Sequence, residues 1–95
     1  MEAVGSVPGT SDRHRVRFFG LSTCVWCRRT RRLLEANAVP FEFSYVDLLD
    51  GDRKQEALDE LGRWNARLSY PTLIIDEKTC IVGYKPDQIK EALDI

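Results

Sequence analysis

The sequence predicts one α/β domain with the element order βαβαββα, built on a four-stranded mixed sheet with helices on both faces. Short runs rich in β-branched and aromatic residues alternate along the chain with longer segments of helical periodicity. A length of 95 residues is enough for one compact core and too short for two ordinary domains. Apolar residues make up 43% of the chain and charged residues 31%, which allows a buried core beneath a polar surface.

The N-terminal residues 1–14 are rich in glycine, proline, serine and threonine and show no apolar periodicity. We therefore expect a flexible tail over 1–14 that carries no chemistry, and a folded domain over 15–95. The tail lacks the apolar run of a secretory signal, and no apolar run in the chain approaches the roughly 20 residues that cross a bilayer.

Composition also bounds the partners. The chain has three cysteines, two of them in a close pair, whereas small secreted domains usually carry several disulfides. We therefore expect a reducing, cytoplasmic location. Fourteen basic and fifteen acidic side chains leave a net charge of −1, so no overall field favours nucleic acid or an anionic membrane. We expect a monomer without nucleic-acid or membrane partners.

The first strand is predicted at 15–20, where β-branched and aromatic residues end at Gly20. Ser22 or Thr23 then offers an N-cap for a helix that we expect to run to about Asn37. Four residues at helical spacing predict its buried face: Cys27, Thr30, Leu34 and Ala38.

Pro40 breaks this helix, and the alternation of side chains after it predicts a second strand over 41–47. Between Asp50 and Gly62 the helical spacing of apolar residues predicts a second helix, with Asp50 or Asp52 near its start and Gly62 past its end. Because a helix joins the first two strands, we expect them to pair in parallel.

The C-terminal part of the chain predicts a hairpin and a last helix. Two short β-rich runs at 72–75 and 80–82 flank the turn-like residues 76–79, which is typical of an antiparallel pair. Pro86 suits the first turn of a helix that turns Ile89 and Leu93 inward.

Cys24 and Cys27 form a Cys-x-x-Cys pair at the start of the first predicted helix. Unpaired N–H groups and the positive end of the helix dipole favour a thiolate at that place. Thiol–disulfide exchange needs such a reachable thiolate and a second thiol to resolve the mixed disulfide. We therefore predict that Cys24 is the nucleophile and that Cys27, one turn deeper, is the resolving thiol.

A Cys-x-x-Cys pair also occurs in zinc and iron–sulfur sites. A structural zinc ion needs two more ligands, and only Cys80 and His14 remain as candidates of the usual kind. We therefore expect no metal site and no tightly bound cofactor. Cys80, in the last predicted strand, is interpreted as a small buried apolar residue.

The chain resembles the glutaredoxin family in four segments that follow one another in the family's order: VRFFG at 16–20, CVWC at 24–27, YPT at 70–72 and VGYKPD at 82–87. The resemblance implies a thioredoxin-like/glutaredoxin fold from about Val16 to Leu93. It also implies a dithiol–disulfide oxidoreductase, an electron carrier that reduces protein disulfides or glutathione mixed disulfides. In that family the residue matching Pro71 follows a cis peptide bond and lies against the active cysteines.

Substrate contacts are expected between the cysteines and in the two later motifs, at Val25, Trp26, Tyr70, Pro71, Thr72, Gly83, Tyr84 and Lys85. A tryptophan at a helix tip is hard to bury, which favours a contact role for Trp26. The run of arginines after Cys27 is interpreted first as a solvated helix face, and the alternative is that it attracts acidic partners.

Two departures from the common family pattern bear on the partners. Val25 and Trp26 stand where Pro-Tyr is common between the cysteines. The last motif is more similar to redoxins that donate electrons to ribonucleotide reductase, which are generally served by a reductase protein. Glutathione and a thioredoxin-type reductase are therefore both candidate electron donors. The alternative function is an iron–sulfur cluster-binding module that uses Cys24 and glutathione.

Overall fold

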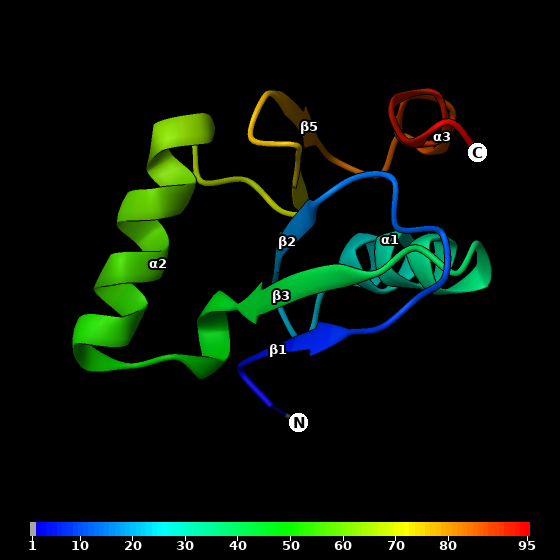
Figure 1. Ribbon diagram of the computed structural model, residues 1–95. Coiled ribbons are helices and arrows are strands. Elements are labelled where there is room, and N and C mark those ends of the chain that lie inside the picture. The colour runs from blue at the N-terminus through cyan, green and yellow to red at the C-terminus, as the bar shows by residue number, and fades with distance from the viewer. Residues whose placement is uncertain (1) are drawn as a thin grey trace.

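Five strands form a single mixed sheet in the order β1-β3-β2-β4-β5 (Figure 1). Their bounds are β1 Val4–Val7, β2 Val16–Gly20, β3 Phe41–Tyr45, β4 Thr72–Ile75 and β5 Thr79–Val82. β2 and β3 pair in parallel, and the other three neighbouring pairs are antiparallel. This computed structural model describes residues 2–95.

Three helices cover the two faces of the sheet, with α2 on one face and α1 and α3 on the other (Figure 1). Their bounds are α1 Val25–Ala36, α2 Gly51–Trp64 and α3 Pro86–Leu93, and a 3-10 turn, η1 Val46–Leu48, follows β3. None of these helices is long and apolar enough to cross a membrane. The fold is the predicted thioredoxin-like α/β arrangement, including the parallel pair and the closing hairpin.

The core is divided by the sheet because successive residues of a strand point to opposite faces. Phe18 packs with Leu34 of α1 and Ile89 of α3, whereas its neighbour Phe19 packs with Leu61 of α2. All five of these side chains are buried, with at most 5% of their surface exposed. The two phenylalanines of β2 therefore anchor both layers of helix on the strand that leads to the cysteine pair.

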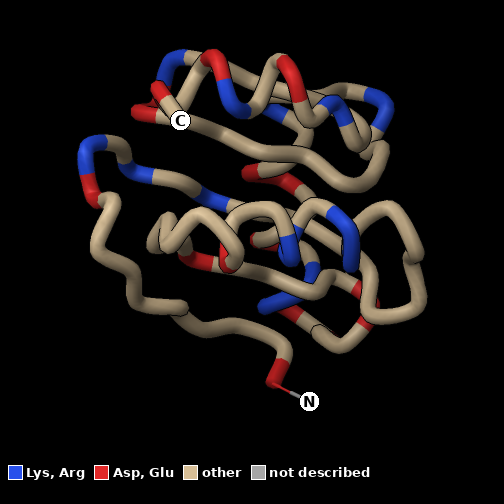
Figure 2. Tube along the Cα trace, turned by 90° about the vertical axis from the view of Figure 1, so that its right-hand side faces the viewer, with Lys and Arg blue, Asp and Glu red and all other residues tan. Residues whose placement is uncertain are grey.

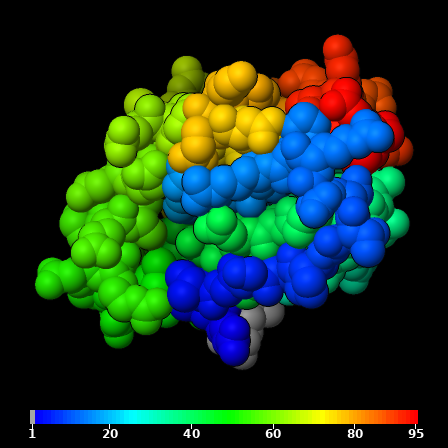
Figure 3. Space-filling model, viewed as in Figure 1, coloured from blue at the N-terminus to red at the C-terminus, as the bar shows by residue number. Residues whose placement is uncertain are grey.

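The predicted number of strands is wrong, because the segment expected to be a tail contributes β1. Val4–Val7 pairs antiparallel with β3, with Gly5 opposite Phe43. A Cβ on Gly5 would lie 2.8 Å from the Phe43 ring, so the missing side chain lets β1 approach over the aromatic residues of β3. Figure 3 shows the N-terminal segment, in blue, lying along the body of the molecule. Neither Ser6 nor Gly5 is a strand former, so this strand depends on its partner.

Three predicted boundaries also differ from the structure. The N-cap of α1 is Cys24 itself and not Ser22 or Thr23. Gly62 lies inside α2, which continues to Trp64, because a glycine in a helix is only mildly unfavourable and its neighbours pack well. The second strand ends at Tyr45, and the next residues tighten into η1.

Candidate redox-active site

Cys24 lies where β2 has ended and α1 begins. As the N-cap it has extended backbone angles, φ −86° and ψ 120°, and its sulfur accepts the backbone N–H of Cys27 at 3.2 Å. Its own N–H donates to the carbonyl of Leu21 at 3.2 Å, which closes the turn before the helix. No acidic side chain lies in the first turn of α1. The Cys24 sulfur is therefore partly exposed and held against helix N–H groups, which favour negative charge.

Cys27 is the buried member of the pair, with 1% of its surface exposed. Burial, and then a hydrogen bond with Cys24, raise the pKa of Cys27 from 9.0 to about 12. Gly20 lies beside it, since a Cβ on Gly20 would come within 3.4 Å of the Cys27 Cβ. The two thiols are free and chemically unequal: one is reachable, and the other holds its proton in the core.

The second predicted segment, Tyr70–Thr72, leads into β4. The peptide bond between Tyr70 and Pro71 is cis, as the family resemblance implies. Thr72 is fully buried, and its hydroxyl donates to the carbonyl of Ser69 at 2.8 Å. The Thr72 side chain therefore stabilises the loop Ser69–Thr72 and does not face solvent.

The third segment is joined to the second by a backbone hydrogen bond, because Gly83 N–H donates to the Pro71 carbonyl at 2.7 Å. Gly83 has φ +91°, in the left-handed region that favours glycine. Tyr84, the next residue, stacks on Trp26 with ring centroids 5.8 Å apart and an interplanar angle of 23°. This contact brings the last loop to the start of α1, beside Cys24.

Trp26 is 53% exposed, as predicted for a tryptophan at a helix tip, and Val25 beside it is 51% exposed. The guanidinium of Arg29 lies over the Trp26 ring, 5.0 Å from its centroid. Arg29, Trp26 and Tyr84 thus form a stacked group next to the exposed sulfur. The sequence locates Arg29 one turn from Trp26 but does not reveal the stacking.

Sequence reasoning missed Asp47, which follows β3 and lies at the same end of the sheet as the cysteines. Its carboxylate accepts the Ser22 N–H at 2.9 Å and also the Ser22 hydroxyl. Burial opposes ionisation of Asp47, but the hydrogen bonds from Ser22 outweigh it and lower its pKa. Burial, and then the charge of Asp47, raise the pKa of Tyr70. Asp47 therefore fixes the turn before Cys24 to the end of β3. The one available signal is that parallel strands β2 and β3 end at the same edge.

Cys80 lies on the edge strand β5, opposite Ile74 of β4, and burial raises its pKa. The sequence suggests a buried Cys80, but the structure shows this residue half-buried. Within residues 2–95 no group of three or more histidine, cysteine or acidic residues is arranged to hold a metal ion.

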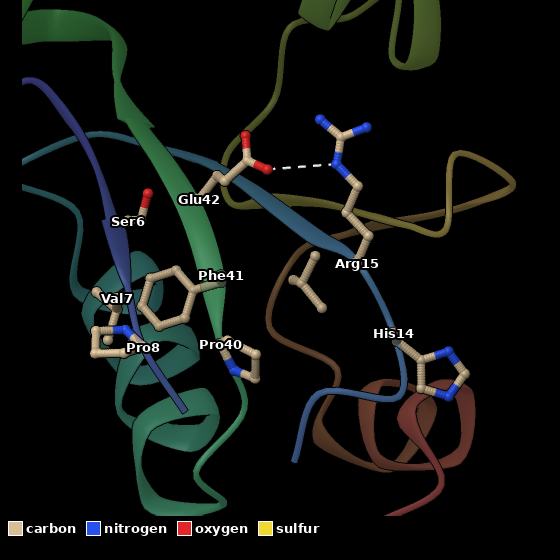
Figure 4. Close-up of a pocket in the computed structure, with 9 residues that line it drawn as sticks. Ser6, Val7, Pro8, His14, Arg15, Pro40, Phe41 and Glu42 are labelled. Carbon is tan, nitrogen blue, oxygen red and sulfur yellow. Dashed lines mark hydrogen bonds and ion pairs between the residues drawn. The ribbon is translucent and has the colours of Figure 1, made fainter. Parts of the chain in front are cut away.

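A pocket of about 390 Å³ lies at the opposite end of the parallel strands (Figure 4). Val7 and Phe41 contribute apolar walls, and Arg15 donates to Glu42 at 3.3 Å across its rim. Its lining contains none of the predicted site residues, so it is separate from the cysteine site.

Comparison with known proteins agrees with this geometry. The sequence profile of the glutaredoxin family matches residues 16–80. The Gene 56 protein of Mycobacterium phage L5 is 31% identical over 71 residues, a match that covers 75% of this chain and 64% of that relative's length. The chain thus spans less than two thirds of that curated relative.

Three solved structures share the fold. The glutaredoxin of Methanosarcina mazei is 42% identical with a TM-score of 0.89, and the match covers 99% of this chain and 90% of that one. The methanoredoxin of Methanosarcina acetivorans is 44% identical with a TM-score of 0.85 and 88% of each chain covered. NrdH-redoxin from Escherichia coli, described as glutaredoxin-like with a thioredoxin-like activity profile, is 28% identical with a TM-score of 0.65, covering 81% of this chain and 92% of that one.

Proposed function

The chain belongs to the glutaredoxin family, and from that premise we propose that it is a dithiol–disulfide oxidoreductase in which Cys24 attacks the substrate and Cys27 resolves the mixed disulfide. One observation carries the assignment of roles. The Cys24 sulfur is partly exposed and accepts the Cys27 N–H at 3.2 Å, whereas the Cys27 thiol is buried and its pKa is raised to about 12 by that burial. A nucleophile needs access and negative charge, and a resolving thiol needs only proximity.

The reaction has two exchange steps. The Cys24 thiolate attacks one sulfur of the substrate disulfide, so that an S–S bond forms to Cys24, the substrate S–S bond breaks and the second substrate sulfur leaves as a thiolate that takes up a proton. Cys27 then loses its proton and attacks the Cys24 sulfur, which releases the first substrate sulfur. The dithiol gives two electrons to the substrate and becomes the Cys24–Cys27 disulfide.

The substrates we propose are protein disulfides and glutathione mixed disulfides. Val25 and Trp26 follow Cys24 and are exposed, Tyr84 of the last loop stacks on Trp26, and Lys85 is the next residue of that loop. We assign the remaining substrate contacts to the backbone of Tyr70 to Thr72 and of Gly83. The Gly83 N–H donates to the Pro71 carbonyl, so these two segments lie side by side. These residues supply contact area, and the cysteines supply the chemistry.

The oxidised protein is recycled by two electrons from glutathione or from a thioredoxin-type reductase. The loop sequence VGYKPD favours the reductase, and the related NrdH-redoxin is described as having a thioredoxin-like activity profile. Two coupled assays decide between the donors: NADPH consumption with glutathione and glutathione reductase, and NADPH consumption with thioredoxin reductase.

Cysteine variants test the proposed roles. Cys24→Ser should abolish disulfide reduction, and Cys27→Ser should accumulate a mixed disulfide that is visible as an added substrate mass under non-reducing conditions. Cys80→Ser is the matched control and should keep wild-type rates, because Cys80 lies on the edge strand β5. Undiminished turnover by Cys24→Ser would contradict the proposal.

A further inference from the structure

The exposed face of α1 carries a group of positive side chains that begins at Arg28, one turn after Cys24. Residues at positions 25, 28, 29 and 32 share one side of a helix because they are three or four apart. Arg28, Arg29 and Arg32 are all exposed there, and the buried Cys27, Thr30 and Leu34 occupy the opposite side. The segment 21–34 contains four arginines and no acidic residue, although the whole chain has a net charge of −1. Figure 2, turned by 90° from the view of Figure 1, marks the positions of lysine and arginine along the backbone in blue and those of aspartate and glutamate in red.

The cations of this face are not used to hold the fold together. Among residues 2–95, no ion pair involves Arg28, Arg29 or Arg32. Arg31, which points to the other side of α1, is different: it donates to the Tyr45 hydroxyl at 2.8 Å and lies 4.8 Å above the Phe43 ring. One arginine of the run is therefore structural, and the other three present their charge to solvent.

The stacked group places this charge beside the cysteine. Arg29 lies over Trp26, and Trp26 stacks on Tyr84, so the guanidinium is held near the start of the helix and not left to sample solvent freely. Lys85, the residue after Tyr84, is exposed and adds a cation to that loop. Exposed tryptophan and arginine together are the residues most enriched at energetically dominant contacts.

We propose that this face, defined by Arg28, Arg29, Arg32, Lys85 and the Trp26–Tyr84 stack, docks an acidic segment of a partner protein that lies next to the partner's disulfide. The inference rests on the proposed function and specifies its partner. The charged part of α1, from Arg28 to Arg32, extends about 6 Å along the helix axis at the helical rise, which exceeds the span of one carboxylate and suits more than one acidic residue of a segment. Attraction between opposite charges would speed encounter and orient the disulfide toward Cys24.

Two disulfide peptides that differ only in their flanks provide the test. One carries glutamates beside the disulfide, and the other carries lysines at the same positions. We expect kcat/KM for the acidic peptide to be higher by about tenfold at low salt, and the preference to shrink as ionic strength rises, since salt screens exposed charges. Equal rates for the two peptides at low salt would overturn the proposal.

Matched charge variants locate the preference. The triple variant Arg28→Gln, Arg29→Gln, Arg32→Gln should bring the ratio of the two rates close to one. The control Arg13→Gln, Arg53→Gln, Lys78→Gln removes the same number of exposed cations elsewhere and should keep the ratio. A ratio that falls equally in both variants would mean that net charge alone is responsible and would overturn the assignment to α1.

The stack is tested separately. Trp26→Ala should lower the preference for the acidic peptide by about threefold, the amount expected for a lost cation–π contact, whereas Trp26→Phe keeps a ring under Arg29 and should retain most of it. A preference unchanged in Trp26→Ala would show that the stack has no part in docking.

Small substrates separate this inference from the function on which it rests. Failure of the wild-type protein to reduce the neutral bis(2-hydroxyethyl) disulfide would overturn the oxidoreductase function itself. Reduction of that disulfide without any preference for the acidic peptide would overturn only the docking proposal. A charge preference seen with glutathione disulfide but with neither peptide would assign the cations to a small anion and would also overturn it.

Discussion

At the scale of single residues, the two thiols of the pair differ in what surrounds each sulfur, and this difference links stability to pH. Burial, and then the contact with Cys24, raise the pKa of Cys27 from 9.0 to about 12. The unfolded chain releases this proton near pH 9, and the folded chain keeps it to higher pH. The contribution of the buried thiol to stability is therefore complete below pH 9 and is lost as the pH rises from 9 toward 12.

Between pH 7 and pH 10 we expect the free energy of unfolding of the reduced wild type to fall by about 1.4 kcal/mol more than that of Cys27→Ala. The reason is that pH 10 lies one unit above the pKa of the unfolded thiol, and one pH unit corresponds to that amount per proton. Urea unfolding at both pH values under reducing conditions measures it. Equal pH dependence of the two proteins would contradict the assignment of the shift to Cys27.

The position of the reactive pair could be predicted because its signal is local. Strand formers end at Gly20 and helical periodicity begins a few residues later, so the neighbouring sequence alone places Cys24 and Cys27 at the start of a helix. The Trp26–Tyr84 stack could not be predicted, because its residues come from distant parts of the sequence and only the packing of α3 and β5 decides where Tyr84 lies. Asp47 was missed for the same reason, since its partner Ser22 belongs to another loop.

At the scale of elements, periodicity predicted the three α-helices and the four strands β2 to β5. It failed for β1, where Val4 and Val7 are the only strand formers and Gly5 and Ser6 lie between them. That strand forms because β3 supplies a partner with its hydrogen bonds, which a single sequence does not display. The predicted end of α2 at Gly62 is wrong because the rule that glycine follows a helix is statistical, and here Leu61 before Gly62 and Trp64 after it both pack against the core.

Two glycines that differ in their surroundings should respond oppositely to alanine. A Cβ on Gly9 would lie 2.2 Å from the Ala38 carbonyl oxygen, whereas a Cβ on Gly62 would make an ordinary contact of 3.7 Å with Leu68. We expect Gly9→Ala to lower the free energy of unfolding by about 1–3 kcal/mol through backbone displacement. Gly62→Ala should raise it by up to about 1 kcal/mol, because alanine favours the helix.

Urea denaturation of the two alanine variants beside the wild type measures both effects. If Gly62→Ala lowered the free energy of unfolding, or if Gly9→Ala left it unchanged, the space around these two glycines would differ from that described.

At the scale of the whole molecule, one side chain joins three distant parts of the chain. His14 precedes β2, and its Nδ1 lies 2.5 Å from Asp76 in the β4–β5 turn while its Nε2 lies 3.0 Å from Asp94 after α3. The hydrogen bonds to Asp76 and then to Asp94 raise the pKa of His14 above 6.5. The stabilisation that this cation provides is complete below pH 6.5 and is lost as the pH rises through the pKa of the folded state.

His14 is the only histidine in the sequence, so its ring protons can be followed without assignment of other residues. An NMR titration should give a pKa above 6.5, and Asp94→Asn should move it down because one of the two carboxylates is lost. His14→Gln should remove the decline in stability over the same pH range. A titration at the value of an isolated imidazole would show that the three segments are not joined in solution.

The position of β1 at the border of the sheet determines which strand meets other molecules. Without it, Phe41–Tyr45 would be outermost, and a row of unpaired backbone groups flanked by aromatic rings invites edge-to-edge association between copies. Val4–Val7 therefore shields this edge of the sheet, and detachment of that strand would expose β3 to a pairing between copies that can propagate into fibres.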